Sequence, residues 1–127
     1  MHDGSVDLKA EARARIYAQP IEALDPAQPD LFAQDSFWPI FERLREEDPV
    51  HFVTSPDYGP FWSITRWNDI MAVDSNHGAF SSADGITLQS LESKAEQARR
   101  GTRPSFISMD PPRHDEQRKT VSPVVAP

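Results

Sequence analysis

The chain has 127 residues, of which 20 are acidic and 13 are Lys or Arg, so its formal net charge is −7. A length of this order suits one domain, and the acidic balance argues against nucleic acid as a partner, because nucleic acids select basic surfaces. The absence of cysteine excludes a disulfide framework and leaves the chain without a thiolate ligand of its own.

The N-terminal residues 1–30 predict an arm ahead of the main folded portion, residues 31–127. Residues 6–17 contain several alanines but few large apolar side chains, and they predict a short polar helix. Prolines interrupt residues 19–30, which predicts an extended lead-in on the surface. Neither a signal peptide nor a membrane-spanning stretch is visible, so we expect a soluble, cytoplasmic protein with no membrane contact.

The next segment predicts an amphipathic helix followed by an antiparallel hairpin. Residues 37–47 place large apolar side chains at steps of three and four. Residues 50–54 and 61–65 are rich in β-forming side chains, and the segment 55–60 between them is full of turn residues. The pattern is typical of two strands joined by a tight connection.

No metal-binding or catalytic grouping stands out. His2, His51 and His77 each lack a companion at metal-ligand spacing, which favours a structural or surface role for each of them. With five glycines and no phosphate-cradling loop, a nucleotide site has little support.

A helix and a long connection follow the hairpin. Thr65 is predicted to cap a helix over residues 66–74, and residues 80–82 predict a short third strand. Residues 88–100 have helical propensity but a thin apolar stripe. A weakly anchored helix inside a long loop is typical of a lid or a binding loop.

The most informative segment is residues 108–119. Asp110 can accept hydrogen bonds from the free amides of a first helical turn, and the two prolines after it tolerate early helical positions. The helix is expected to end at Ser122, because a residue before a proline is disfavoured in the α region. His114 and Arg118 are four residues apart, so they share one face of this helix.

Two hydrogen-bonding groups beside the apolar Val121 suit a ligand that is mostly apolar and carries carboxylates at one edge. Haem is such a ligand. Arginine offers a carboxylate a fork of donors, and histidine adds a bond from either ring nitrogen. The alternative is a solvated helix face near Asp115 and Glu116, since exposed pairs contribute only about 0.2–1 kcal/mol.

The pattern Asp-Pro-Pro-x-His-x-x-x-Arg at residues 110–118 resembles the C-helix motif of soluble bacterial cytochrome P-450 monooxygenases. Three upstream segments are similar to the first sheet hairpin and the B helix of that family: residues 51–54, 58–65 and 68–73. The sequence at residues 107–109 and 119–123 is most similar to that of the subfamily that hydroxylates the terminal carbon of medium-chain alkanes.

The resemblance implies a mainly α fold with a small antiparallel β-sheet (α+β), the N-terminal part of the P-450 fold through its C helix. It implies that His114 and Arg118 bind the propionates of haem, iron protoporphyrin, whose axial cysteine lies outside this chain. The family's domain continues for several hundred residues, so the chain is expected to be truncated.

The resemblance also implies a substrate surface and a partner surface. In the family the connection between the B and C helices roofs the haem and makes the first substrate contacts, which makes Ile86, Leu88 and Leu91 candidates. Equally, these side chains could pin the loop to the core. Lys119, with Arg113 on its flank, is a candidate for contact with a ferredoxin-type electron donor, and an ordinary solvated lysine is the alternative.

The implied reaction inserts one oxygen atom from O₂ into an unactivated C–H bond, with terminal hydroxylation of alkanes as the specific expectation. No catalytic residue is assigned within the chain, and the chain alone is predicted to be inactive because it lacks the thiolate. The competing hypothesis is a free-standing α+β binding or regulatory module that carries the His/Arg helix without haem.

Overall fold

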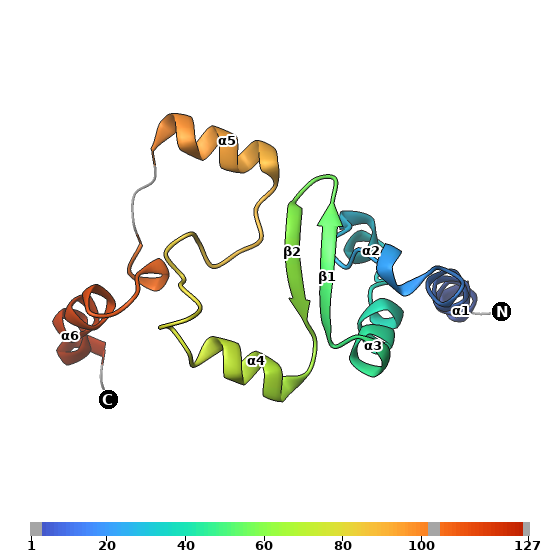
Figure 1. Ribbon diagram of the computed structural model, residues 1–127, viewed down its shortest axis with the longest axis horizontal. Coiled ribbons are helices and arrows are strands. Elements are labelled where there is room, and N and C mark those ends of the chain that lie inside the picture. Colours follow the sequence, from blue (N-terminus) through green and yellow to red (C-terminus); the bar gives the residue numbers. More distant parts are fainter. Residues whose placement is uncertain (1–3, 102–104, 126–127) are drawn as a thin grey trace. The chain divides into compact units, whose positions relative to one another are not determined.

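The computed structural model describes residues 4–101 and 105–125 (Figure 1). The chain divides into two compact units, Met1–Ile70 and Met71–Pro127. The described residues form helices and one two-stranded antiparallel sheet, which confirms the predicted α+β class. In chain order the elements are α1 (Gly4–Tyr17), the 3₁₀-helix η1 (Ile21–Ala23), α2 (Pro29–Ala33), α3 (Trp38–Glu47), β1 (Val50–Ser55), β2 (Gly59–Ile64), α4 (Trp67–Asp74), α5 (Leu91–Arg100), the 3₁₀-helix η2 (Phe106–Ser108) and α6 (Arg113–Val125).

A small apolar core holds the first unit together. Ile40 and Leu44 lie one turn apart on α3 and are 1% and 0% exposed, which confirms the amphipathic helix predicted over residues 37–47. Burying a side chain of this size stabilises the fold by about 1.5–3 kcal/mol. The other buried members of the cluster come from α1, from the segment after η1 and from α2: Ile16, Leu24 and Leu31.

Helix α1 is docked on α3 rather than loose. Arg43 of α3 donates from Nη1 to the carbonyl of Ile16 at 2.9 Å and to that of Gln19 at 2.7 Å. Ile16 is in the last turn of α1, where carbonyls have no partner within the helix, and Gln19 lies two residues past its end, so this guanidinium ties the end of α1 to α3. The helix predicted over residues 6–17 is therefore confirmed, with its C-terminal end anchored.

The segment after α1 enters the core, so the prediction of an extended surface lead-in is wrong. Residues 21–23 form η1, and Leu24 is only 2% exposed. Asp25 and Pro26 are buried as well. The prolines do stop α-helix formation, but a short turn between two of them is enough to direct one large apolar side chain inward.

The predicted hairpin is confirmed. Strands β1 and β2 lie side by side and pair antiparallel (Figure 1). The register sets Phe52 opposite Trp62, and the two rings lie 5.0 Å apart on the exposed face. Gly59 has φ +75°, a value that glycine adopts without steric cost as the chain leaves the turn. Alternation along β1 places three side chains inside: His51, Val53 and Ser55.

His51 has the structural role that the sequence favours. Its side chain is 2% exposed, with Nε2 at 2.9 Å from the Leu24 carbonyl and Nδ1 at 2.7 Å from Oδ2 of Asp48. The carbonyl can only accept, so Nε2 carries a proton. The ring thereby connects the segment after η1 to the first strand and to the end of α3.

Two expectations around α4 are wrong. Thr65 does not serve as the predicted helix cap: α4 begins two residues later, at Trp67, and the hydrogen bond that the Thr65 hydroxyl makes is the one it donates to the Pro49 carbonyl at 3.2 Å. Residues 80–82 form no strand, because the sheet of the described chain contains β1 and β2 alone. At Thr65 the bond goes to a residue distant in sequence, and Ser81 and Ser82 likewise bond to the distant Asp110.

Helix α5 begins three residues later than predicted. Ser90 is its N-cap, and its Oγ accepts a hydrogen bond from the Ser93 amide at 3.1 Å. None of the side chains of α5 is buried. The prediction of a weakly anchored helix over residues 88–100 is confirmed, with Leu88 left outside its start.

Candidate functional site

Helix α6 carries the His/Arg pair, and its start differs from the prediction. The Asp110 carboxylate accepts hydrogen bonds from Ser81 and Ser82 instead of from amides of the first turn. The backbone carbonyl of Asp110 still accepts from the His114 amide at 3.2 Å. Regular helix therefore begins at Arg113, because the side chain expected to cap it is used elsewhere.

The end of α6 also differs, because the helix continues through Pro123 to Val125. Pro123 cannot donate an amide bond to the Lys119 carbonyl, and its ring crowds that carbonyl, so the helix continues with one hydrogen bond missing in its last turn. The Ser122 hydroxyl donates to the Arg118 carbonyl at 2.9 Å and supports the same turn. The expected stop at Ser122 is therefore wrong.

His114 is the most enclosed of the predicted site residues. Its side chain is 27% exposed, and its ring stacks on that of Phe106 in η2 with 6.3 Å between centroids. Nδ1 lies 3.0 Å from Oδ1 of Asp115. When Nδ1 donates to this carboxylate, Nε2 can donate to a further acceptor only if the ring is doubly protonated.

Arg118 lies one turn after His114 on the same face of α6 and is exposed. Among residues 4–101 and 105–125, none of the ion pairs in the structure involves Arg118. Val121 occupies the next turn of that face and is 48% exposed. One side of α6 thus combines an imidazole, a guanidinium and an exposed apolar surface, which we call the His/Arg face.

The candidate substrate residues lie between α4 and α5 or at the start of α5. Ile86, Leu88 and Leu91 are 56%, 48% and 51% exposed. In this chain none of them is buried in a core, so their apolar surface is available to contact something else.

The candidate partner residues lie apart from the His/Arg face. Lys119 is exposed and is about 140° around the helix axis from His114, given 3.6 residues per turn. Arg113 is exposed at the first position of α6, about 100° from His114 in the other direction.

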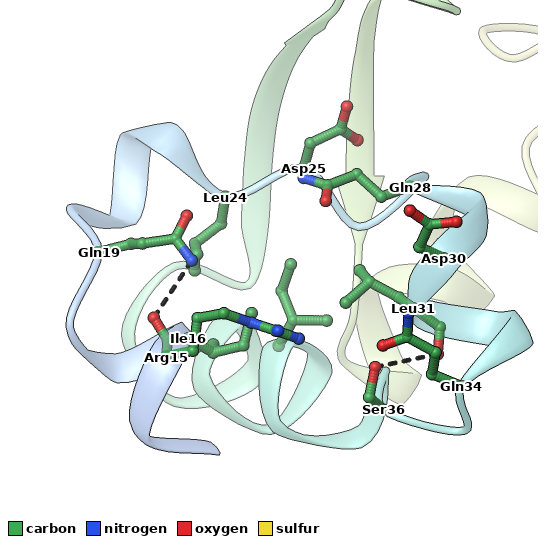
Figure 2. Close-up of a pocket in the computed structure, with 11 residues that line it drawn as sticks. Arg15, Ile16, Gln19, Leu24, Asp25, Gln28, Asp30, Leu31, Gln34 and Ser36 are labelled. Atoms are coloured by element: carbon green, nitrogen blue, oxygen red, sulfur yellow. Dashed lines mark hydrogen bonds between the residues drawn. The ribbon is translucent and has the colours of Figure 1, made fainter. Parts of the chain in front are cut away.

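A feature that the sequence did not indicate is a cavity of about 280 Å³ in the first unit (Figure 2). Its lining mixes apolar and polar side chains, and Figure 2 shows the Gln19 amide bonded to the Arg15 carbonyl and the Ser36 hydroxyl bonded to the Leu31 carbonyl. Its lining residues all lie between Arg15 and Ile40 but belong to several elements, so the cavity depends on how α1, α2 and α3 pack.

Two kinds of feature are absent from the described parts of the chain. These residues contain no group of three or more His, Cys, Asp or Glu side chains able to hold a metal ion. No helix within them has both the length and the apolar character needed to cross a bilayer.

Known proteins resemble the chain over most of its length. It is 33% identical over 112 residues to linalool 8-monooxygenase of Pseudomonas putida, a match that covers 84% of this chain and 28% of that protein. It is 36% identical over 87 residues to cytochrome P-450 130 of Mycobacterium tuberculosis, covering 67% and 21%. No family model matches the chain.

Solved structures agree with these relatives. CYP153D17 from Sphingomonas sp. PAMC 26605 superposes with a TM-score of 0.71 at 39% identity, over 81% of this chain and 25% of its own. Cytochrome P-450-153 from Novosphingobium aromaticivorans gives 0.65 at 35% identity, over 81% and 29%.

The hairpin and the helices around it match the N-terminal part of a monooxygenase fold. The chain belongs to the cytochrome P-450 family, and the two solved relatives described above are members of the 153 group. It spans between 21% and 28% of the length of the two curated relatives described above.

Proposed function

We propose that this chain is the N-terminal part of a haem-dependent monooxygenase that inserts one oxygen atom from O₂ into an unactivated C–H bond of an apolar small molecule. The observation that carries the proposal is the His/Arg face of α6. Three expectations stay predictions: an N-terminal arm of residues 1–30, a truncated domain portion of residues 31–127 and a cytoplasmic location.

The residues of the His/Arg face fit haem, which is a flat, apolar molecule with two carboxylates at one edge. His114 and Arg118 would each donate to a propionate. Val121 on the same helix and Phe106 on η2, which packs against α6, offer exposed apolar surface. When bound, haem and its axial cysteine, which lies outside this chain, supply the oxygen chemistry. The chain's own residues bind the group, orient it and neutralise its carboxylates.

The propionate assignment is tested in the full-length protein. Arg118→Ala is expected to weaken haem retention more than His114→Ala, because arginine offers a permanent charge and two donors, whereas the histidine bond depends on protonation. A hydrogen bond to a charged group contributes about 1.5–3 kcal/mol, which is roughly ten- to a hundred-fold in affinity. The double variant should lose most of its haem.

The measurement is transfer of haem from each purified variant to apo-globin, followed by absorbance. Lys119→Ala is the matched control, since it removes a basic side chain from a different face of the same helix. If Arg118→Ala folds normally and releases haem as slowly as the unmodified protein, the assignment fails and a solvated helix face is the better interpretation.

Alkanes are the proposed substrate class, with oxidation at the terminal carbon. The similarity to members of the 153 group, an alkane-hydroxylase subfamily, supports this. The exposed apolar side chains Ile86, Leu88 and Leu91 offer hydrocarbon surface without a polar partner. Unbranched alkanes should therefore change the haem absorbance of the full-length protein, and failure to do so at saturation would exclude them.

The chain by itself is proposed to be inactive. It contains no cysteine, so reduction under carbon monoxide should give no thiolate-type difference spectrum. A clear thiolate-type Soret shift from the 127-residue chain would contradict this.

A ferredoxin-type electron donor is proposed to contact Lys119, with Arg113 at the flank. Charge complementarity mainly raises the association rate and is weakened by salt. Lys119→Glu in the full-length protein should slow transfer of the first electron at low salt and flatten its salt dependence. An unchanged salt dependence would leave Lys119 an ordinary solvated side chain.

A further inference from the structure

The carboxylate of Asp110 connects two segments that lie far apart in the sequence. It accepts a hydrogen bond from the Ser81 hydroxyl, 29 residues away, and one from the Ser82 amide at 2.9 Å, 28 residues away. The Ser81 oxygen also accepts from the Ala83 amide at 3.0 Å. We call this network of Ser81, Ser82, Ala83 and Asp110 the carboxylate clip.

The clip is made by the ionised carboxylate. The hydrogen bond from Ser81 and then that from Ser82 lower the pKa of Asp110, and the nearby His77 acts in the same direction. A group with a lowered pKa contributes its stabilisation at neutral pH and loses it only as the pH falls through that pKa. The hydrogen bonds of the clip are therefore strongest with the carboxylate ionised, and they weaken as the pH falls through the pKa of Asp110.

The described residues between the two halves of the clip show no comparable anchor. Within the described residues 83–101 and 105–109, every hydrogen bond or ion pair that stays inside the segment joins close neighbours in sequence. Helix α5 buries no side chain, and the apolar side chains before it are exposed. Closing such a long loop costs chain entropy, so the tie at its base has a large effect on where the loop can go.

We propose that Asp110 is a positioning residue for the substrate of the proposed monooxygenase. By closing the base of the loop, the clip holds Ile86, Leu88 and Leu91 in place relative to the start of α6, and so determines which lengths of hydrocarbon chain fit beside the haem. This rests on the proposed function, because it assigns these side chains to the substrate surface.

The first test uses the 127-residue chain and NMR titration. The Ser82 amide proton should shift with the same midpoint as the Asp110 carboxyl carbon, below the ordinary range for aspartate. Asp110→Asn and Ser81→Ala should abolish the low midpoint, while Ser81→Thr, which keeps the hydroxyl, should restore it. Asp84→Asn, an exposed carboxylate in the same loop, is the control. A Ser82 amide that does not follow Asp110 overturns the clip.

The second test uses the full-length haem protein and the absorbance change on adding hexane, octane, decane or dodecane. Asp110→Asn and Ser81→Ala should weaken binding of the preferred alkane by roughly tenfold or more and flatten the preference among chain lengths, with haem content unchanged. Asp84→Asn should leave both as they are. An unchanged preference overturns the positioning role alone. If the unmodified protein holds no haem, that result overturns both proposals, and the amide titration still reports whether the clip forms.

Discussion

The buried imidazole of His51 gives the sharpest stability prediction, because its partners and exposure are defined. His51→Leu removes the donor to the Leu24 carbonyl, which is then left unpaired in the core at a cost of about 1–3 kcal/mol. Asp48 is 41% exposed, so water replaces its lost partner and that bond adds at most about 1 kcal/mol. The expected destabilisation of the first unit is thus about 2 kcal/mol, or roughly thirtyfold.

Amide hydrogen exchange is the suitable assay, because it reports local opening without requiring a cooperative transition. Exchange of the β1 and β2 amides should become roughly thirtyfold faster in His51→Leu. Thr54→Leu is the control, since it places the same side chain at an exposed position of the same strand. His51→Gln keeps a donor and should lie between the two. Equal exchange in His51→Leu and Thr54→Leu would refute the role assigned to the ring.

Three further substitutions, the first with an exposed control, test the packing and the helix ends. Leu44→Ala, at a side chain that is 0% exposed, should cost about 2–5 kcal/mol by the same exchange assay, whereas Phe52→Ala on the exposed hairpin face should cost far less. Ser90→Ala removes the cap of α5 and should cost about 0.5–2 kcal/mol, seen as a loss of helical chemical shifts in its first turn. Gly101→Ala places a side chain at φ +75° and should fray the last turn of α5, at about 1–3 kcal/mol by the same shifts. A Ser90→Ala chain with an intact first turn would show that α5 does not depend on its cap.

The sequence by itself determined the features that depend on neighbours along the chain. Apolar residues in steps of three and four, as from Phe37 to Ile40 and Leu44, predict α3, because a helix brings both spacings to one face, whereas a strand puts residues three apart on opposite faces. Two runs of β-forming residues joined by turn residues predict the hairpin, since the second strand follows the first directly after the turn. The same locality makes the face shared by His114 and Arg118 predictable, as one helix carries both.

Only the tertiary structure decided the features in which a distant group replaces a local one. Thr65 bonds to Pro49 and Asp110 bonds to Ser81 and Ser82, although each is a good cap for the helix that follows it. Leu24 enters the core from a proline-interrupted segment that looks exposed. A hydroxyl or carboxylate has the same chemistry in a cap and in a long-range bond, so its partner depends on which backbone groups the fold brings within about 3 Å. That proximity belongs to the packed chain and is absent from any short window of the sequence.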